Sequence, residues 1–222
     1  MCGFAGLVSW DDRFRVGRDV LERMSAAVAH RGPDGAGLYI NHEGPVSRAR
    51  PFCGLVHRRL AILDLDERAL QPFENELCSR WLVFNGEIYN FRDLRDQIGV
   101  MQTARGDEPR WRTTCDTEVL LAAYDAWGGG CVDRFNGMFA FAVWDQIAGE
   151  LFLARDRMGQ KPLYYALAPE NRAIAFASEL GALRHVPWVD RTVDFGAVAE
   201  YLRWGYVAAP RTIYAGAAKL AP

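Results

Sequence analysis

The chain opens with Met1-Cys2-Gly3-Phe4-Ala5-Gly6-Leu7-Val8-Ser9-Trp10. The small and apolar residues after Cys2 predict a buried strand. If Met1 is cleaved, Cys2 carries a thiol and a free α-amine on one residue. The amine, with an ordinary pKa of about 7.7–8.0, can accept the proton of the thiol, whose ordinary pKa is about 8.5. Cys2 is therefore a candidate nucleophile with its own base, although a processing signal or a buried structural cysteine also explains it.

Composition and charge argue against several classes of protein. The 222 residues suit one large domain or two small ones. Half of them are hydrophobic and 24% are charged, so the chain can bury a substantial core. The net charge of −2 gives no electrostatic reason to expect nucleic acid or an anionic membrane as a partner. The longest apolar run, at 138–144, is far too short to span a bilayer, and the N-terminus lacks the basic region of a signal peptide.

The cysteines and histidines do not form a pattern typical of a disulfide frame or a metal site. The five cysteines are odd in number, widely spaced and without a C-x-x-C pair. The four histidines show no metal-ligand spacing. We therefore predict reduced thiols, a cytoplasmic location and no metal.

Periodicity predicts single helices between groups of strands. Helices are predicted at 20–28, from about 91, at 116–127 before Gly128-Gly129-Gly130, and at 195–202, with one face formed by Phe195, Val198, Ala199 and Leu202. Strands are predicted at 37–40, 54–65, 81–84, 138–144, 150–155, 163–168 and 173–178. The last four strands read as an antiparallel meander, and 100–114 as a loop. The order lacks a regular βαβ rhythm and indicates an α+β fold built on antiparallel sheets.

A thiolate that cleaves an amide needs hydrogen-bond donors aimed at the oxygen that becomes negative. Asn85-Gly86 offers a side-chain amide and a neighbouring backbone N–H at the end of a predicted strand. An Asn-Gly hairpin turn is the alternative. The following residues, Glu87-Ile88-Tyr89-Asn90, make a poor return strand, which counts against the hairpin.

An amino-acid substrate needs a cation for its carboxylate and anions for its ammonium. Arg59 suits the first role because guanidinium binds carboxylate bidentately, and a surface arginine beside Arg58 is the alternative. Glu87 and Asp116 suit the second role, and Asp116 also suits a helix N-cap. Spacing alone leaves these alternatives open.

Seven motifs occur in the order found in one known family. They are CGFAG at 2–6, HRGPDG at 30–35, HRRLAILD at 57–64, FNGEIYN at 84–90, DTE at 116–118, FNGMFAFA at 135–142 and RDRMGQKPLYY at 155–165. Together they resemble the glutaminase domain of glutamine-hydrolysing asparagine synthetase, a class II amidotransferase of the N-terminal-nucleophile hydrolases. The resemblance covers nearly the whole chain and implies a four-layer αββα sandwich, with two antiparallel sheets between helical layers.

The resemblance also implies the chemistry of the site. Cys2 matches the nucleophile that attacks the side-chain amide of glutamine, with its α-amine as the base. Asn85 and Gly86 match the oxyanion hole and also contact glutamine.

The remaining matches concern glutamine recognition. Arg59 matches the clamp on the α-carboxylate, and Glu87 and Asp116 match the acids that bind the α-ammonium. The glutamine pocket is further implied to be lined by the backbone of Leu60, Ala61, Ile62 and Leu63.

The chain lacks the motifs of the family's second half. That half binds ATP through a Ser-Gly-Gly-x-Asp-Ser loop, and the chain contains neither this run nor G-x-x-x-x-G-K-[ST]. We predict an amidotransferase domain at 1–205 and a bridge toward a synthetase domain at 206–222. No cofactor is predicted in this chain, and ATP and Mg²⁺ are expected only on the synthetase half.

Three functions stay open at this stage. The first is hydrolysis of glutamine to glutamate and ammonia for asparagine synthesis, with L-glutamine and an ammonia-accepting synthetase domain or subunit as partners. The second is an amidotransferase half that serves a sugar, phosphoribosyl or peptide acceptor. The third is a catalytically silent module that binds an amino acid. A homodimer is compatible with each of them.

Overall fold

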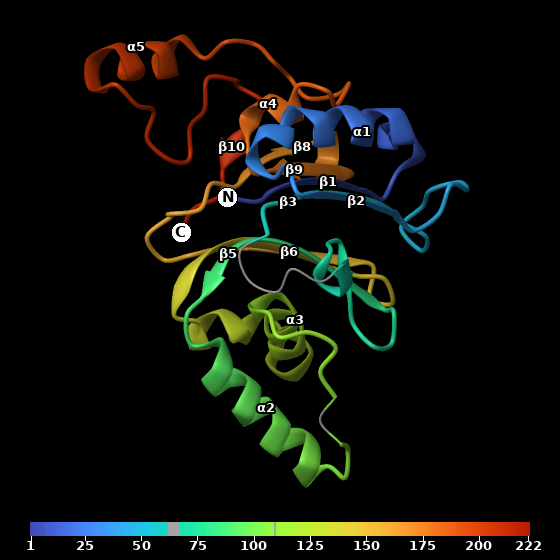
Figure 1. The fold of residues 1–222 in the computed structure, drawn as a ribbon. Helices are drawn as coiled ribbons and strands as arrows, with labels where there is room; N and C mark the ends of the chain where they lie inside the picture. The colour runs from blue at the N-terminus through green and yellow to red at the C-terminus, as the bar shows by residue number, and fades with distance from the viewer. Residues whose placement is uncertain (62–66, 109) are drawn as a thin grey trace.

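A computed structural model describes residues 1–61, 67–108 and 110–222, and these residues form four layers (Figure 1). The two middle layers are antiparallel sheets that face each other. Helices α1 and α4 cover the outer face of one sheet, and α2 and α3 cover the outer face of the other. Their bounds are Arg18–Ala27 for α1, Phe91–Ala104 for α2, Asp116–Trp127 for α3 and Leu180–Leu183 for α4. The predicted α+β architecture of two antiparallel sheets between helical layers is confirmed.

The six-stranded sheet has the order β10-β8-β9-β1-β3-β2. Its strands are β1 (Gly3–Ser9), β2 (Gly35–Ile40), β3 (Phe52–Arg59), β8 (Tyr164–Leu167), β9 (Ala173–Ala177) and β10 (Ala218–Lys219). All seven residues of β1 are buried, as predicted. Alternate side chains of β1 serve two cores: Leu7 packs in the cluster with α1, whereas Phe4 and Val8 pack between the sheets. The strand that follows Cys2 is therefore fixed on both faces.

The four-stranded sheet has the order β4-β5-β6-β7. Its strands are β4 (Phe73–Glu74), β5 (Arg80–Ile88), β6 (Gly137–Asp145) and β7 (Glu150–Arg155). β5 and β6 pair along their whole length, with Asn85 opposite Ala140. β4 is so short that it pairs only with Trp81 and Leu82. Among the described residues, the later half of β5 therefore has a neighbouring strand on one edge only.

The predicted meander of the last four strands is wrong in one respect. β6 and β7 form a hairpin in the four-stranded sheet, whereas β8 and β9 form a hairpin in the other. The chain crosses between the sheets after Arg155. The crossing is held by the buried carboxylate of Asp156, which accepts hydrogen bonds from the backbone N–H groups of Met158, Gln160 and Lys161.

Three element boundaries differ from the prediction. α2 continues to Ala104 rather than ending before 100, because Leu94 and Ile98 anchor it on the core and its last turn extends over the surface. The predicted strand at 54–65 ends at Arg59 as β3, Leu60 and Ala61 are irregular, and 62–65 lie outside the described residues. The glycines after α3 end it at Gly128, where φ is +57°, but the chain continues as a 3₁₀ helix, η4 (Gly128–Arg134). The other 3₁₀ helices are η1 (Asp12–Phe14), η2 (Ala29–Arg31), η3 (Glu67–Ala69) and η5 (Pro169–Asn171).

Helix α5 (Phe195–Trp204) stands apart from the four layers (Figure 1). The helix is confirmed, and Asp194 caps it by accepting from the N–H groups of Gly196 and Ala197. Its predicted apolar face is uncovered, since Phe195 is 80% and Leu202 is 79% exposed. Within the described ranges, no helix combines the length and the apolar character needed to cross a bilayer.

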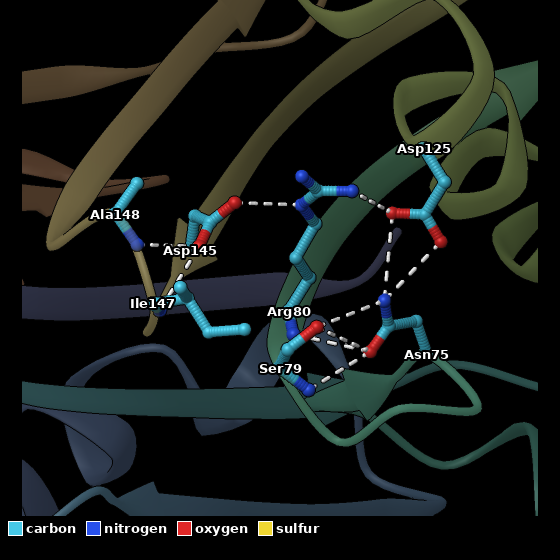
Figure 2. Close-up of polar contacts among 7 residues, drawn as sticks. All are labelled: Asn75, Ser79, Arg80, Asp125, Asp145, Ile147 and Ala148. Atoms are coloured by element: carbon cyan, nitrogen blue, oxygen red, sulfur yellow. Dashed lines mark hydrogen bonds and ion pairs between the residues drawn. The ribbon is translucent and has the colours of Figure 1, made fainter.

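Helix α3 is attached to β5 at both of its ends. Near the start of β5, the Arg80 guanidinium donates to the carboxylates of Asp125 on α3, at 2.6 Å, and Asp145 on β6, at 2.7 Å (Figure 2). Asn75 also donates to Asp125, at 3.2 Å. Near the end of β5, the N–H of Ile88 donates to a carboxylate of α3, 2.9 Å away. These two attachments fix the position of α3 along the length of β5.

Candidate active site

A cavity of about 140 Å³ joins the start of the chain to β3, β5 and α3. Its lining includes seven of the predicted site residues: Cys2, Arg59, Leu60, Asn85, Gly86, Glu87 and Asp116. Ala61 does not line it, although its N–H is held by the carboxylate of Asp34 at 2.9 Å. Ile62 and Leu63 lie outside the described residues. Residues separated by more than 100 positions in sequence therefore meet at one site.

Cys2 lies half-buried at the edge of this cavity. The N–H of Leu60, just after β3, donates to Cys2 Sγ at 3.4 Å. Arg31 contacts the backbone of Cys2. Its Nε donates to the Cys2 carbonyl at 3.0 Å, and its Nη1 forms an ion pair with the Glu179 carboxylate at 2.9 Å. Met1 is 56% exposed and lines the same cavity. The thiol is thus fixed by its neighbours on both sides of the residue.

Asn85 and Gly86 lie inside strand β5, so the hairpin alternative is wrong. Side chains alternate along a strand, and Asn85 projects to the same face as Val83, toward the six-stranded sheet. Asn85 is 1% exposed, and its Nδ2 has no hydrogen-bond partner among the described residues. An unpaired buried amide N–H is costly, so this donor is available to a ligand in the cavity.

Gly86 permits a close approach of backbone to backbone. A Cβ at this position would lie 2.2 Å from the carbonyl oxygen of Met138 and 2.7 Å from Cα of Phe139, so only glycine fits. Its N–H lies on the same edge of β5 as that of Phe84, because backbone groups alternate with a period of two. Beyond Leu82 that edge has no strand partner in the part of the chain that the structure describes, and Gly86 lines the cavity there.

Asp116 is the first residue of α3 and not its N-cap, which corrects the helix-cap alternative. The cap position is Cys115, whose side chain makes no capping bond. The Asp116 carboxylate instead accepts from the N–H of Ile88 at 2.9 Å and faces the cavity. Burial raises the pKa of Asp116 to about 6, and the nearby carboxylate of Glu87 adds to the rise. A cationic ligand group in the cavity would relieve both effects.

Arg59 ends β3 and is 8% exposed, so the surface-arginine alternative is wrong. Its carbonyl accepts from the N–H of Asp34 at 2.9 Å, and its side chain lines the cavity. The cavity therefore combines a cation, two acids, a thiol and an unpaired amide donor. This set can bind an amino acid by its carboxylate and ammonium and can place a third group between the thiol and Asn85.

The prediction missed several residues that line the cavity. Gln71 is buried, and its Oε1 accepts from the N–H of Phe84 at 2.6 Å. Lys161 is 5% exposed, and its Nζ lies 3.0 Å from Met1 Sδ. The motif at 155–165 contained Lys161 but gave no reason to assign it a role. The others are Ala69, Phe84, Cys115, Thr117 and Met138.

Comparisons with known proteins bear on this geometry. One family profile, described as "Glutamine amidotransferase domain", matches residues 1–222. "Putative asparagine synthetase [glutamine-hydrolyzing] 2" of Methanocaldococcus jannaschii is 34% identical over 240 residues, which cover 99% of this chain and 42% of that protein. "Asparagine synthetase [glutamine-hydrolyzing] 3" of Bacillus subtilis is 34% identical over 227 residues, covering 100% of this chain and 34% of that protein. The chain thus spans less than half the length of either relative.

A solved structure shares the fold. It is glutamine phosphoribosylpyrophosphate amidotransferase from B. subtilis, with a TM-score of 0.60 and 20% identity over 83% of this chain and 43% of that one. This likeness confirms the predicted fold, with two antiparallel sheets between helical layers. With the profile and the two relatives, it also confirms the resemblance read from the seven motifs. The chain belongs to the glutamine amidotransferase domain family.

Proposed function

We propose that this chain hydrolyses the side-chain amide of glutamine to glutamate and ammonia, with Cys2 as the nucleophile. The observation that carries the proposal is that the Cys2 thiol and the unpaired Nδ2 of Asn85 line one cavity. Arg59 supplies the cation for the α-carboxylate, and Glu87 and Asp116 supply the anions for the α-ammonium. Incubation of the protein with glutamine should release glutamate and ammonia in equal amounts. A protein that binds glutamine without releasing either would be the silent module instead.

The steps follow from the positions of these groups. Cys2 Sγ bonds to the amide carbon, the thiol proton passes to the α-amine of Cys2, and the carbonyl electron pair moves onto oxygen. Asn85 Nδ2 and the Gly86 N–H donate to that oxygen. The proton then goes to the leaving nitrogen, which departs as ammonia and leaves a thioester. Water then attacks the thioester carbon and gives a proton to the α-amine, and a second oxyanion forms at the same position. Its collapse breaks the C–S bond and releases glutamate, and the Cys2 thiolate takes the proton back from the amine.

We further propose that the ammonia serves ATP-dependent asparagine synthesis from aspartate. The support is that the two relatives are named as glutamine-hydrolyzing asparagine synthetases, of which this chain spans 42% and 34%. ATP and Mg²⁺ would belong to the remainder of such a protein, with 206–222 as the bridge to it. A sugar, phosphoribosyl or peptide acceptor is the alternative. The five free cysteines support a reducing compartment, which we propose to be the cytoplasm.

Activity should require removal of Met1. A retained methionine leaves no free amine on Cys2 and occupies part of the cavity wall. Intact-mass spectrometry of active protein should lack the mass of one methionine, and a preparation with partial removal should have activity in proportion to the processed fraction. Full turnover by protein that keeps Met1 would contradict the role of the amine.

The KM for glutamine should rise as the pH falls below about 6. Asp116 has a raised pKa of about 6, so it is ionised at pH 7 and becomes neutral on acidification, when it loses its attraction for the ammonium. Asp116→Asn should have a high KM at neutral pH and lose this dependence. Glu118→Gln is the matched control, because Glu118 is a buried acid in the same helical turn that does not line the cavity. Steady-state kinetics from pH 5 to 8 measure all three proteins, and a normal KM for Asp116→Asn would contradict the assignment.

A further inference from the structure

The peptide unit of Phe84, just before Asn85, is held by two side chains from distant parts of the chain. The N–H of Phe84 donates to Gln71 Oε1 at 2.6 Å, and its carbonyl accepts from His57 Nε2 at 3.1 Å. His57 is 1% and Gln71 is 6% exposed. Both backbone groups of Phe84 on this edge of β5 are thus satisfied without a strand partner.

Gln71 takes the place of a missing ladder bond. β4 pairs Phe73 with Leu82 and stops there, and the same register would place Gln71 opposite Phe84. The side-chain oxygen of Gln71 accepts the Phe84 N–H instead. The edge of β5 is therefore closed up to Phe84 and open at Gly86, which lines the cavity.

His57 joins the two sheets at the level of the site. It belongs to β3 and lies opposite Phe4 of β1, two residues from Cys2. Three residues later on the same segment, the Leu60 N–H donates to Cys2 Sγ. One segment thus contacts both the thiol and the strand that carries Asn85. The segment 57–60 therefore links the candidate nucleophile to the strand that carries the candidate oxyanion donors.

The imidazole ring of His57 is suited to donate this hydrogen bond throughout the neutral pH range. Burial lowers the pKa of His57 to about 4, and the positive charge of Arg59 contributes, so the ring is neutral at neutral pH. A neutral ring has one N–H, and the Phe84 carbonyl requires it on Nε2. Nδ1 has no partner among the described residues, and within them the ring forms a hydrogen bond with the Phe84 carbonyl alone.

We propose that His57 and Gln71 are positioning residues, which hold the Phe84 peptide so that Asn85 Nδ2 and the Gly86 N–H point at the developing oxyanion. This inference rests on the proposed glutamine hydrolysis. Neither side chain bonds the substrate in the reaction, so their loss should weaken binding of the tetrahedral state and spare binding of glutamine itself.

The test compares variants that each lack one hydrogen bond to Phe84. Methionine has the length of glutamine without its amide, and it also lacks the ring N–H of histidine. His57→Met and Gln71→Met therefore each remove one bond to Phe84. His57→Gln keeps a donor at that position. His42→Met is the matched control, because His42 also contacts a carbonyl through Nε2, that of Pro51 at 3.0 Å, and lies outside the cavity lining. The ligand is the aldehyde analogue of glutamine, whose carbonyl adds the Cys2 thiol to give a hemithioacetal with its oxygen in the oxyanion position.

The inhibition constant of the aldehyde should rise about 10–100-fold in His57→Met and Gln71→Met, with kcat falling in parallel and the KM for glutamine within about twofold of wild type. His57→Gln should recover most of the loss, and His42→Met should show none. Wild-type inhibition constants in both Met variants would overturn the inference, and so would an equal rise in inhibition constant and KM. If His57→Met does not fold, Gln71→Met decides the outcome by the same two constants. A wild-type protein that neither hydrolyses glutamine nor binds the aldehyde overturns the proposed function and the inference with it.

Discussion

Cys2→Ala is expected to abolish glutamine hydrolysis while leaving glutamine bound. In the proposed mechanism the thiol forms the bond to the amide carbon, and no other described residue that lines the cavity combines a thiol with a free amine once Met1 is removed. In the proposed function, recognition depends on Arg59, Glu87 and Asp116, which line the cavity and which the substitution does not touch. Ammonia release should fall to background, and calorimetry should show a dissociation constant for glutamine close to the KM of the wild type.

Cys115→Ala is the matched control for this variant. Cys115 lines the same cavity and is 3% exposed, but its thiol contacts Thr113 Oγ1 at 3.1 Å and it lies inside the chain, with no free amine. Its activity should stay within a few-fold of wild type. Comparable turnover by Cys2→Ala, or loss of turnover only in Cys115→Ala, would mean that the nucleophile is wrongly assigned.

Asn85→Ala should lower kcat by about 10²–10³ with a small effect on KM, the usual result of losing one oxyanion donor. Its Nδ2 is buried and has no partner within the described ranges, so removing it breaks no hydrogen bond from that atom to a described residue. The effect should therefore fall on the reaction rather than on the fold. Steady-state kinetics and a thermal melt of the same preparation measure the two quantities.

Val83→Ala separates the loss of a donor from the loss of packing. Val83 lies two residues earlier on β5, faces the same core and is fully buried, but does not line the cavity. This variant should melt earlier, since a buried aliphatic truncation costs about 1–3 kcal/mol, and should keep its kcat. Equal kcat for Asn85→Ala and wild type would leave Asn85 without a role in the reaction.

Local signals in the sequence predicted most elements but not how they meet. The apolar run after Cys2 indicated β1, and the apolar period after Asp116 indicated α3, since both patterns reflect burial of the element's own face. Asn85-Gly86 carries a turn signal, yet these residues form a strand. Their pairing with Ala140 and Phe139 comes from a segment more than 50 residues away, and such pairing overrides local propensity.

The parts of the site that escaped prediction depend on topology. Gln71 lines the cavity because β4 ends before it. The side chain of Gln71 then accepts the Phe84 N–H in place of a strand partner, and no local sequence pattern encodes this bond. Lys161 lines the cavity because the chain crosses from one sheet to the other after β7. The sequence pattern instead predicts four consecutive strands in one meander, which places Lys161 in an ordinary connection. The residues at 2, 59, 85, 86, 87 and 116 were named because the chemistry of an amino-acid amide demands their types and the motif order resembles a known family.

The double attachment of α3 to β5 bears on the trade-off between stability and function. Because the native state holds the Asp116 proton more tightly than the unfolded chain does, stability falls as the pH rises from about 4 to about 6. Ionised Asp116 thus costs on the order of 3 kcal/mol at neutral pH, about two pKa units, before any ligand arrives. Arg80 offsets this at the other end of the helix, where its bonds to Asp125 and Asp145 hold α3 in place independently of Asp116. Under the proposed function, the protein thus keeps a carboxylate that opposes folding at the position where it would bind the substrate ammonium.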